Sequence, residues 1–379
     1  MRRWFDAFSL FIVPLVQDSS KKQHMQRQLA HFRRIACLGL PPQAAVVALL
    51  EALHNLIPSS FNRFGFADQD LRITNGYCED PLCYQFIAPY FSEFDGKMDY
   101  WPTVKDCLRR GPGVGYYLPY QTPQFYQSAY YNEIERPLGS YHQLDATIAD
   151  GERVYGNMVL SRAKGREFSG DERRLLAKTL PYFVHALGAQ GEQAVLADGT
   201  RTTAVVMVDA DGTVQYADTL GLHYLWMLAH DDLTTTAITS KIMMHADAIA
   251  AIVERLACVQ EDRSAAPPTL YVRNGWGNFK LRAEPLIGQP GTTALVRVLI
   301  ERIEPGALAL SRRFSELGLA ARQQDVCELL IKGLTQAEVA LQMGLRPSTV
   351  NEYIQTLYLK LEVRNRQELL QILSAVAPD

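Results

Sequence analysis

The clearest pattern of apolar and polar positions lies between residues 314 and 373, where short helical repeats alternate with stops. Gly333 ends the first repeat, because glycine accepts the left-handed conformation that terminates a helix. Thr335 and Glu338 have the three-residue spacing of a capping box, which predicts a second helix that stops at Gly344. The apolar positions of these two helices are Val326, Leu329, Leu330, Val339 and Met343.

A third and a fourth helix follow in the same pattern. Pro347 suits a first helical turn, where the missing amide hydrogen costs nothing, and Asn365 and Glu368 repeat the capping spacing. Two helices joined by a tight glycine turn, the second with a polar face, are the layout of a DNA-binding helix-turn-helix. A small bundle used only for packing is the alternative. The third helix carries an apolar stripe of Val350, Ile354, Leu357 and Leu361.

The amino-acid sequence of this segment resembles that of a known family. It contains the motifs GLTQAEVA, STV and YLKLEVRNR in that order, and with them it resembles the C-terminal DNA-binding domain of LuxR-type transcriptional regulators. The resemblance extends from about Leu319 to Leu370. That family usually begins the first helix with a Thr or Ser cap and an acidic pair, whereas here Ala320 and Ala321 precede Arg322, and Gln323 stands where a glutamate is typical. We therefore expect the first helix to lack its cap. Arg346 replaces the usual hydroxyl cap of the third helix.

The resemblance implies which residues contact DNA. By motif position, Asn351, Glu352 and Gln355 face the bases, where amides pair best with adenine and a carboxylate accepts from cytosine. Arg366 has a second interpretation, as a structural residue that ties the fourth helix to the third. The other candidate contacts to DNA are Lys332, Thr335, Arg346, Ser348, Thr349, Lys360 and Arg364, together with Arg366 itself.

The charge of this tail limits its affinity. Residues 311–379 contain eight Lys and Arg and eight Asp and Glu, so the segment is neutral. Phosphate neutralisation by basic residues supplies most non-specific affinity for DNA. We therefore expect the isolated domain to bind weakly and to need dimerisation.

Residues 24–195 predict a first antiparallel α+β domain. Two helical stretches precede an alternating segment at 59–72, and residues 148–162 read as a hairpin around an Asp-Gly-Glu turn. Ser169 and Glu172 then have capping spacing before a long amphipathic helix. The hairpin followed by this capped helix resembles a GAF domain.

The middle of this domain is rich in aromatic residues, since residues 84–131 hold fourteen of the chain's 37. Tyrosine combines an apolar body with a polar tip, which suits a pocket for a small, partly polar molecule. Packing beneath long loops is the alternative. Residues 111–115, GPGVG, lack the ending of a phosphate-binding loop and read as a simple turn. The candidate effector-binding residues are Trp101, Tyr116, Tyr117, Tyr126 and Tyr130.

Residues 200–305 predict a second antiparallel module. A buried strand, an Asp211-Gly212 turn, a return strand and a helix resemble the start of a PAS domain. Further strands are expected at 270–273, 279–282 and 293–303, with a helix from Asp247. Residues 188–200 and 304–313 read as linkers. Haem ligation by His223, His230 or His245 is disfavoured, and no metal or cofactor is expected.

Composition adds limits. At 379 residues the chain is too long for a single core, and a net charge of -3 gives no overall attraction to nucleic acid. The six cysteines are expected to be unpaired thiols in a reducing compartment. Residues 1–23 superficially resemble a signal peptide, but Asp6 interrupts the apolar run and no cleavage site follows. No membrane span is predicted, and a cytoplasmic protein is expected.

These patterns together predict a multidomain α+β protein: an extension at 1–23, a GAF-like domain at 24–195, a PAS-like domain at 200–305 and a helix-turn-helix domain at 312–379. We expect a homodimeric, non-enzymatic transcriptional regulator whose partners are double-stranded DNA, a small-molecule effector and RNA polymerase. The alternative is a protein that sequesters another regulator and carries a vestigial DNA-binding tail.

Overall fold

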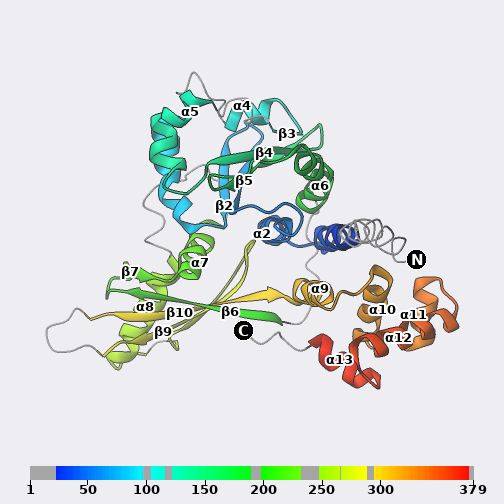
Figure 1. The fold of residues 1–379 in the computed structure, drawn as a ribbon. Helices are drawn as coiled ribbons and strands as arrows, with labels where there is room; N and C mark the ends of the chain where they lie inside the picture. Colours follow the sequence, from blue (N-terminus) through cyan, green and yellow to red (C-terminus); the bar gives the residue numbers. More distant parts are fainter. Residues whose placement is uncertain are drawn as a thin grey trace, which may run out of the picture. The chain divides into compact units, whose positions relative to one another are not determined.

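The computed structural model describes residues 23–95, 97, 104–115, 122–188, 198–231, 247–264, 266–287 and 294–374. The chain folds into two compact units. The two-sheet unit spans Ala36–Pro305, and the helical unit combines Met1–Ile35 with Gly306–Asp379. Figure 1 labels the helices and strands of both units.

The two-sheet unit begins with a five-stranded antiparallel sheet in the order β2-β1-β5-β4-β3. Its alternating side chains place Phe64, Phe66 and Met158 on an apolar face, where they are buried with the helices α2 and α6. The predicted hairpin at 148–162 and the capped helix after Ser169 are confirmed. The bounds are α2 Pro42–Leu53, β1 Phe61–Ala67, β2 Ile73–Cys78, β3 Gly113–Val114, β4 His142–Ala149, β5 Val154–Arg162 and α6 Gly170–Gly188.

Short helical pieces between β2 and β4 cover the opposite face of this sheet. They carry the aromatic residues of the sequence, and Phe125, Tyr130 and Tyr131 are buried among them in one apolar cluster. The predicted simple turn at 111–115 is wrong in part, because Gly113 and Val114 pair with β4 as β3. The pieces are η1 Pro81–Phe86, α3 Ile87–Pro89, η2 Tyr90–Phe94, α4 Val104–Arg109, α5 Pro123–Gln127 and η4 Tyr131–Glu135.

A second five-stranded antiparallel sheet follows in the order β7-β6-β10-β9-β8. It repeats the strand order of the first sheet, and its buried face packs on α7 and α8. Gly212 has a φ of 80° in the predicted turn, and Asp218 caps α7 by accepting from the Gly221 amide. The bounds are β6 Asp198–Val208, β7 Val214–Ala217, α7 Thr219–Ala229, α8 Asp247–Gln260, β8 Thr269–Asn274, β9 Gly277–Pro285 and β10 Val296–Pro305.

The two sheets of this unit are joined by a packed interface. The turn between β8 and β9 places the fully buried Trp276 against Phe66 and Tyr77, with ring centroids 6.1 Å apart in both pairs. The Nε1 atom of Trp276 donates to the carbonyl of His230, which also accepts from the Asn75 side chain. These aromatic contacts and hydrogen bonds tie the second sheet to β1 and β2.

The helical unit contains the four helices that the tail pattern predicts, preceded by α9. Residues 304–313 were expected to form a linker, and this is wrong: β10 ends at Pro305 and α9 begins at Gly306, burying Leu308 and Phe314. The amphipathic spacing of these apolar residues stabilises a helix where the glycine suggested a loop. The bounds are α9 Gly306–Glu316, α10 Ala321–Ile331, α11 Gln336–Met343, α12 Pro347–Leu361 and α13 Arg366–Ser374.

A helix at residues 23–36, far away in sequence, packs on this unit. Arg34 pairs with Asp325 at 3.6 Å and with Glu328, both on α10, and lies over the Phe314 ring. The Nδ1 atom of buried His31 lies 3.4 Å from the Ser311 hydroxyl. Residues 24–35, which the sequence assigns to the first domain, therefore contact the tail. Residues 1–22 lie outside the described part, and so does the interpretation of that segment as an extension.

Candidate functional site

The third helix of the tail, α12, is amphipathic in the way that a recognition helix requires. Its stripe of Val350, Ile354 and Leu357 is buried in the core of the helical unit. Asn351, Glu352 and Gln355 are exposed on its opposite face. Gly344, with a φ of 62°, makes the tight turn from α11. The structure therefore places these three predicted base contacts on one exposed face, after a tight turn.

The polar residues at the starts of α11 and α12 differ in role. Thr335 completes the predicted capping box, because its hydroxyl accepts from the Glu338 amide at 3.4 Å and its own amide donates to the Glu338 carboxylate at 2.7 Å. The hydroxyl also donates to that carboxylate at 2.8 Å. These bonds lower the pKa of the Glu338 carboxyl. Arg346 precedes α12 without capping it through its side chain, and it is exposed. Ser348 is exposed and Thr349 half-buried in the first turn of α12.

The basic residues of the tail divide into exposed and structural ones. Lys332 and Arg364 are exposed. Arg366 donates to the Leu330 carbonyl at 2.7 Å, which ties α13 to the end of α10 rather than to α12. Lys360 is exposed and also donates to the Gly318 carbonyl. Burial, and then nearby Arg27, lower the pKa of Lys360.

The first tail helix is better capped than its sequence suggests. Gln323 accepts from the amide of Ala320 at 3.0 Å, so it performs the return half of a capping box from the position where a glutamate is usual. A capping box has two hydrogen bonds, and the expectation of an uncapped helix is wrong for this one, from the N-cap amide to the side chain three residues later. Ala320 has no side-chain acceptor to supply the other.

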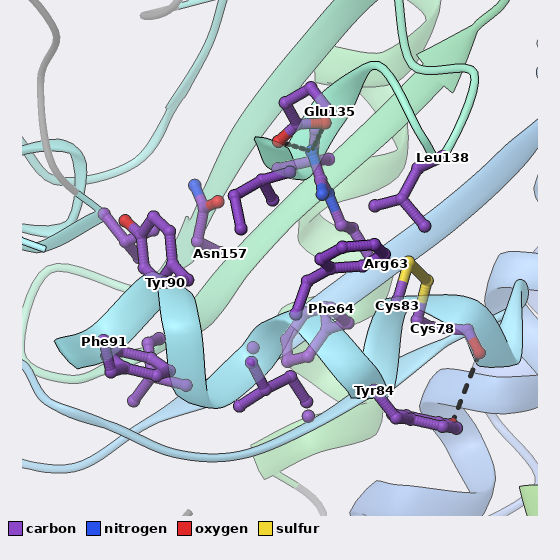
Figure 2. A pocket seen from close by; sticks show the side chains of 18 of the residues that line it. Arg63, Phe64, Cys78, Cys83, Tyr84, Tyr90, Phe91, Glu135, Leu138 and Asn157 are labelled. Carbon is purple, nitrogen blue, oxygen red and sulfur yellow. Dashed lines mark hydrogen bonds and ion pairs between the residues drawn. A yellow bond between two sulfur atoms is a disulfide. The ribbon is translucent and has the colours of Figure 1, made fainter. Parts of the chain in front are cut away.

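A second candidate site is a cavity of about 170 Å³ on the covered face of the first sheet (Figure 2). Successive side chains of a strand point to opposite faces, and on this face most of the buried side chains of β4 and β5 are polar, with Val159 as an apolar exception. Thr147 is paired with Asn157 and Gln143 with Ser161 across β4 and β5, and all four are buried. Burying polar side chains is costly unless they meet polar partners. Gln143 and Asn157 line the cavity.

One wall of the cavity is an internal ion pair. The Nη2 atom of Arg63 donates to both carboxylate oxygens of Glu135, at 2.7 and 2.9 Å, and Glu135 has no exposed surface. Tyr130 also donates to Glu135, at 2.5 Å. Burial, and then the adjacent Glu135 carboxylate, raise the pKa of Tyr130 well above its usual range, so its hydroxyl stays a donor. The two charges therefore compensate one another within the wall.

Aromatic rings form most of the remaining lining. Tyr84, Phe86, Tyr90 and Phe91 come from the helical pieces that cover the sheet. Of the predicted effector residues, Tyr130 lines the cavity, whereas Tyr126 stacks on Tyr141 outside it, with ring centroids 4.5 Å apart. Trp101, Tyr116 and Tyr117 lie outside the described residues.

Sequence reasoning missed the polar residues of the lining, Arg63, Glu135, Gln143 and Asn157. The signal available was the run of polar side chains at alternate positions of β4 and β5, strands that are buried along nearly all their length. That signal depends on knowing that both faces of the sheet are covered.

Among known protein families, a match is found for the tail. Residues 317–373 match the model of bacterial regulatory proteins, luxR family. The tail is a LuxR-family helix-turn-helix domain. A comparison with curated protein sequences finds no match.

Several solved structures share weak likeness with the chain. One is the VqmA dimer of Vibrio cholerae, described among LuxR-type receptors, at 15% identity over 45% of this chain and 81% of that chain, with a TM-score of 0.18. A complex of phage VqmA with DPO matches at 20% identity over 47% and 87% of the two chains, with a TM-score of 0.18. The E. coli DhaR(N)–DhaL complex matches at 11% identity over 72% and 89%, with a TM-score of 0.23. At TM-scores this low, none of them supports a conclusion about this chain.

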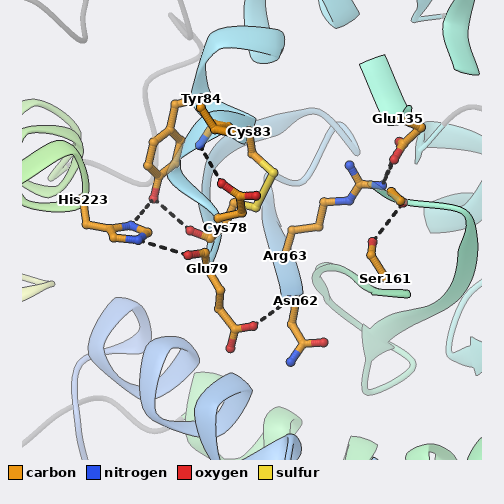
Figure 3. Close-up of a disulfide and its surroundings, with 12 residues drawn as sticks. Asn62, Arg63, Cys78, Glu79, Cys83, Tyr84, Glu135, Ser161 and His223 are labelled. Atoms are coloured by element: carbon orange, nitrogen blue, oxygen red, sulfur yellow. Dashed lines mark hydrogen bonds and ion pairs between the residues drawn. A yellow bond between two sulfur atoms is a disulfide. The ribbon is translucent and has the colours of Figure 1, made fainter. Parts of the chain in front are cut away.

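The wall of the cavity contacts the second sheet module through helix α7. Trp226 on α7 donates from Nε1 to the carbonyl of Gly76, a lining residue, at 2.8 Å. His223 donates from Nε2 to the Glu79 carbonyl at 3.1 Å, and its Nδ1 faces the Tyr84 hydroxyl at 3.3 Å (Figure 3). Burial lowers the pKa of His223, which keeps the ring neutral at pH 7.

The same wall contains a disulfide. Cys78, the last residue of β2, is joined to Cys83 in η1 (Figure 3). The expectation of unpaired thiols is therefore wrong for these two, because η1 turns the chain back toward the strand end. Cys37, Cys107, Cys258 and Cys327 are not joined in a disulfide.

Among the described residues, no three His, Cys, Asp or Glu side chains come together as a group that would hold a metal ion. Within the same residues, none of the helices combines the length and the apolar character that crossing a membrane requires.

Proposed function

We propose that this protein is a sequence-specific DNA-binding transcriptional regulator, in which a small molecule bound in the first sheet module controls DNA binding by a homodimer. The observation that carries the proposal is the LuxR-family match at residues 317–373, together with the exposed amides of Asn351 and Gln355. RNA polymerase is proposed as a further partner at the promoter.

The recognition chemistry follows from the side chains of α12. Asn351 and Gln355 each offer a donor and an acceptor, which suits the adenine edge in the major groove, and Glu352 suits cytosine N4. Since residues 311–379 are neutral, phosphate contacts contribute little per protomer. A two-fold dimer would double the contacts and set half-sites one helical turn apart.

For a ligand to control DNA binding, its binding in the cavity must change the packing of the elements that lead to the tail. Gly76 and Tyr84 line the cavity and contact Trp226 of α7. α7 packs on β6 and β10, and β10 continues into α9 without an intervening residue. A ligand that favours one packing of this wall would shift an equilibrium between two arrangements. We propose that the first module is GAF-like and the second PAS-like, which the shared strand order of the two sheets supports.

The test is footprinting of the full-length protein on the DNA upstream of its own gene and of neighbouring genes. We expect a protected palindrome that disappears when Asn351→Ala and Gln355→Ala are combined. The control is Gln367→Ala, which removes an exposed amide from α13 and should leave protection unchanged.

Two outcomes would contradict the proposal. Binding to every duplex with equal affinity would mean that α12 reads no sequence. Absence of DNA binding, combined with stable capture of another regulator by residues 36–305, would favour the sequestering protein instead.

A further inference from the structure

The size of the cavity restricts its ligand. A cavity of about 150 Å³ holds benzene in an engineered protein, and the cavity here measures about 170 Å³. Tyr84, Phe86, Tyr90 and Phe91 supply aromatic walls that pack well against a flat ring. One six-membered ring with a small substituent fits within this volume, whereas a second fused ring would extend into the open side of the cavity, away from these walls.

The charges of the wall restrict the ligand further. Nη2 of Arg63 donates to both oxygens of Glu135, and the Glu135 carboxylate has no exposed surface. Arg63 and Glu135 are the charged residues among the described ones that line the cavity, and their charges cancel. A charged ligand would therefore bring an uncompensated charge against a largely apolar wall, which is costly. The cavity therefore selects an uncharged molecule.

Asn157 adds one directional contact. Its Nδ2 atom lies 3.3 Å from the carbonyl of Ala146 on the neighbouring strand. Because a carbonyl only accepts, this bond fixes which end of the amide is Nδ2 and leaves Oδ1 as an acceptor. Among the described residues, no donor is assigned to that oxygen. Asn157 lies between Tyr90 and the Arg63–Glu135 pair at the cavity (Figure 2).

We infer that the cavity binds an uncharged single-ring molecule whose O–H or N–H group donates a hydrogen bond to Oδ1 of Asn157. Phenols and cyclic amides of one ring belong to this class. The inference rests on the proposed function, since it names the ligand class of the proposed effector site.

The experiment titrates full-length protein with four simple probes and follows binding by ligand-observed NMR and calorimetry. The probes are phenol, toluene, benzoate and 2-naphthol, which differ in donor, charge and size. We expect phenol to bind roughly 10-fold more tightly than toluene, because a buried acceptor left unsatisfied is costly. Benzoate and 2-naphthol should bind at least 10-fold more weakly than phenol.

Variants locate the binding. Asn157→Leu should bind phenol and toluene with equal affinity, since the acceptor is gone and the apolar volume remains. The matched control is Thr147→Val, which removes a buried polar group directly opposite Asn157 on the same face but outside the cavity lining. That variant should keep the preference for phenol. If Asn157→Leu does not fold, the ranking of the four probes on the unmodified protein still decides the question.

The outcomes separate this inference from the proposed function. Tighter binding of benzoate or 2-naphthol than of phenol, or an unchanged preference in Asn157→Leu, would overturn the ligand class while leaving a DNA-binding regulator in place. Footprinting on the same preparation tests the proposed function, and its failure would not alter the ranking of the probes.

Discussion

The ring of Tyr84 stacks on that of Trp226, with centroids 4.4 Å apart and planes 6° from parallel. Tyr84 belongs to the segment that covers the first sheet and lines its cavity, whereas Trp226 belongs to α7 of the second module. Both side chains are buried. The stack therefore joins the wall of a ligand-sized cavity directly to the helix that supports β6 and β10.

The hydrogen bond beside this stack is expected to stabilise the interface between the two sheets. Trp226→Phe keeps an aromatic ring but removes the donor to the Gly76 carbonyl. We expect a loss of roughly 1–3 kcal/mol in the free energy of unfolding, the cost of leaving a buried acceptor unsatisfied. Urea denaturation of the full-length protein measures it. Tyr271→Phe, at a side chain that is 70% exposed, is the control and should change little.

The buried ion pair of the cavity should behave as a unit. Arg63→Met alone or Glu135→Leu alone leaves one charge without its partner, and we expect each to cost about 3–5 kcal/mol. The double variant should be more stable than the sum of the single losses predicts, because no unpaired charge remains. A double-mutant cycle by denaturation checks this. Additive losses would show that the two side chains do not depend on one another.

Two arginines of the tail should separate folding from DNA binding. Arg366 donates to the Leu330 carbonyl, so Arg366→Ala is expected to lower stability by roughly 1.5–3 kcal/mol. Arg364 is exposed, so Arg364→Ala should keep stability and reduce the salt dependence of DNA affinity by about one phosphate contact. Thermal melts and a salt series on each variant provide the comparison. The assignment fails if Arg364→Ala destabilises the fold and Arg366→Ala does not.

Acid should weaken the attachment of the helix at residues 23–36. Burial, followed by Arg312 and Arg34, lowers the pKa of His31 from 6.5 to about 4. Between these values the unfolded chain binds a proton that the folded chain does not, so His31 contributes stability above about pH 6.5 that is lost as the pH falls toward 4. The full effect is about 3 kcal/mol.

Comparison with His31→Gln isolates this contribution. The variant lacks the titrating ring, so its stability should fall less between pH 7 and pH 4.5 than that of the unmodified protein. Other histidines titrate equally in both proteins and cancel in the difference. Identical pH profiles would show that the folded His31 is protonated as easily as the unfolded one.

The disulfide between Cys78 and Cys83 can be tested by counting the thiols that react with an alkylating reagent. Labelling of denatured protein with iodoacetamide, without reductant, should modify the four cysteines outside the disulfide and leave Cys78 and Cys83 unlabelled. Labelling after reduction should modify all six. Mass spectrometry of the peptides that contain residues 78 and 83 assigns the sites. Equal labelling with and without reductant would show two thiols.

Much of this protein was determined locally by its sequence. The four tail helices followed from caps and stops, such as Thr335 with Glu338 and the left-handed Gly344, because a capping bond joins residues three positions apart. The hairpin before α6 was equally local. The resemblance of the tail to LuxR-type regulators rested on contiguous letters and was confirmed by the family match at residues 317–373. The roles of the individual DNA contacts stay predictions.

Only the tertiary structure decided which residues line the cavity and which helices pack together, because these features depend on contacts made by both faces of a strand or helix. The sequence pointed to aromatic residues for a pocket, but Arg63, Glu135 and Asn157 come from separate segments and meet only when the sheet is paired and covered. The packing of residues 23–36 on the tail, and the helix at 306–316, likewise depend on partners distant in sequence. Caps and turns are short-range interactions that a sequence displays, whereas a cavity is the space left when distant side chains fail to fill a face.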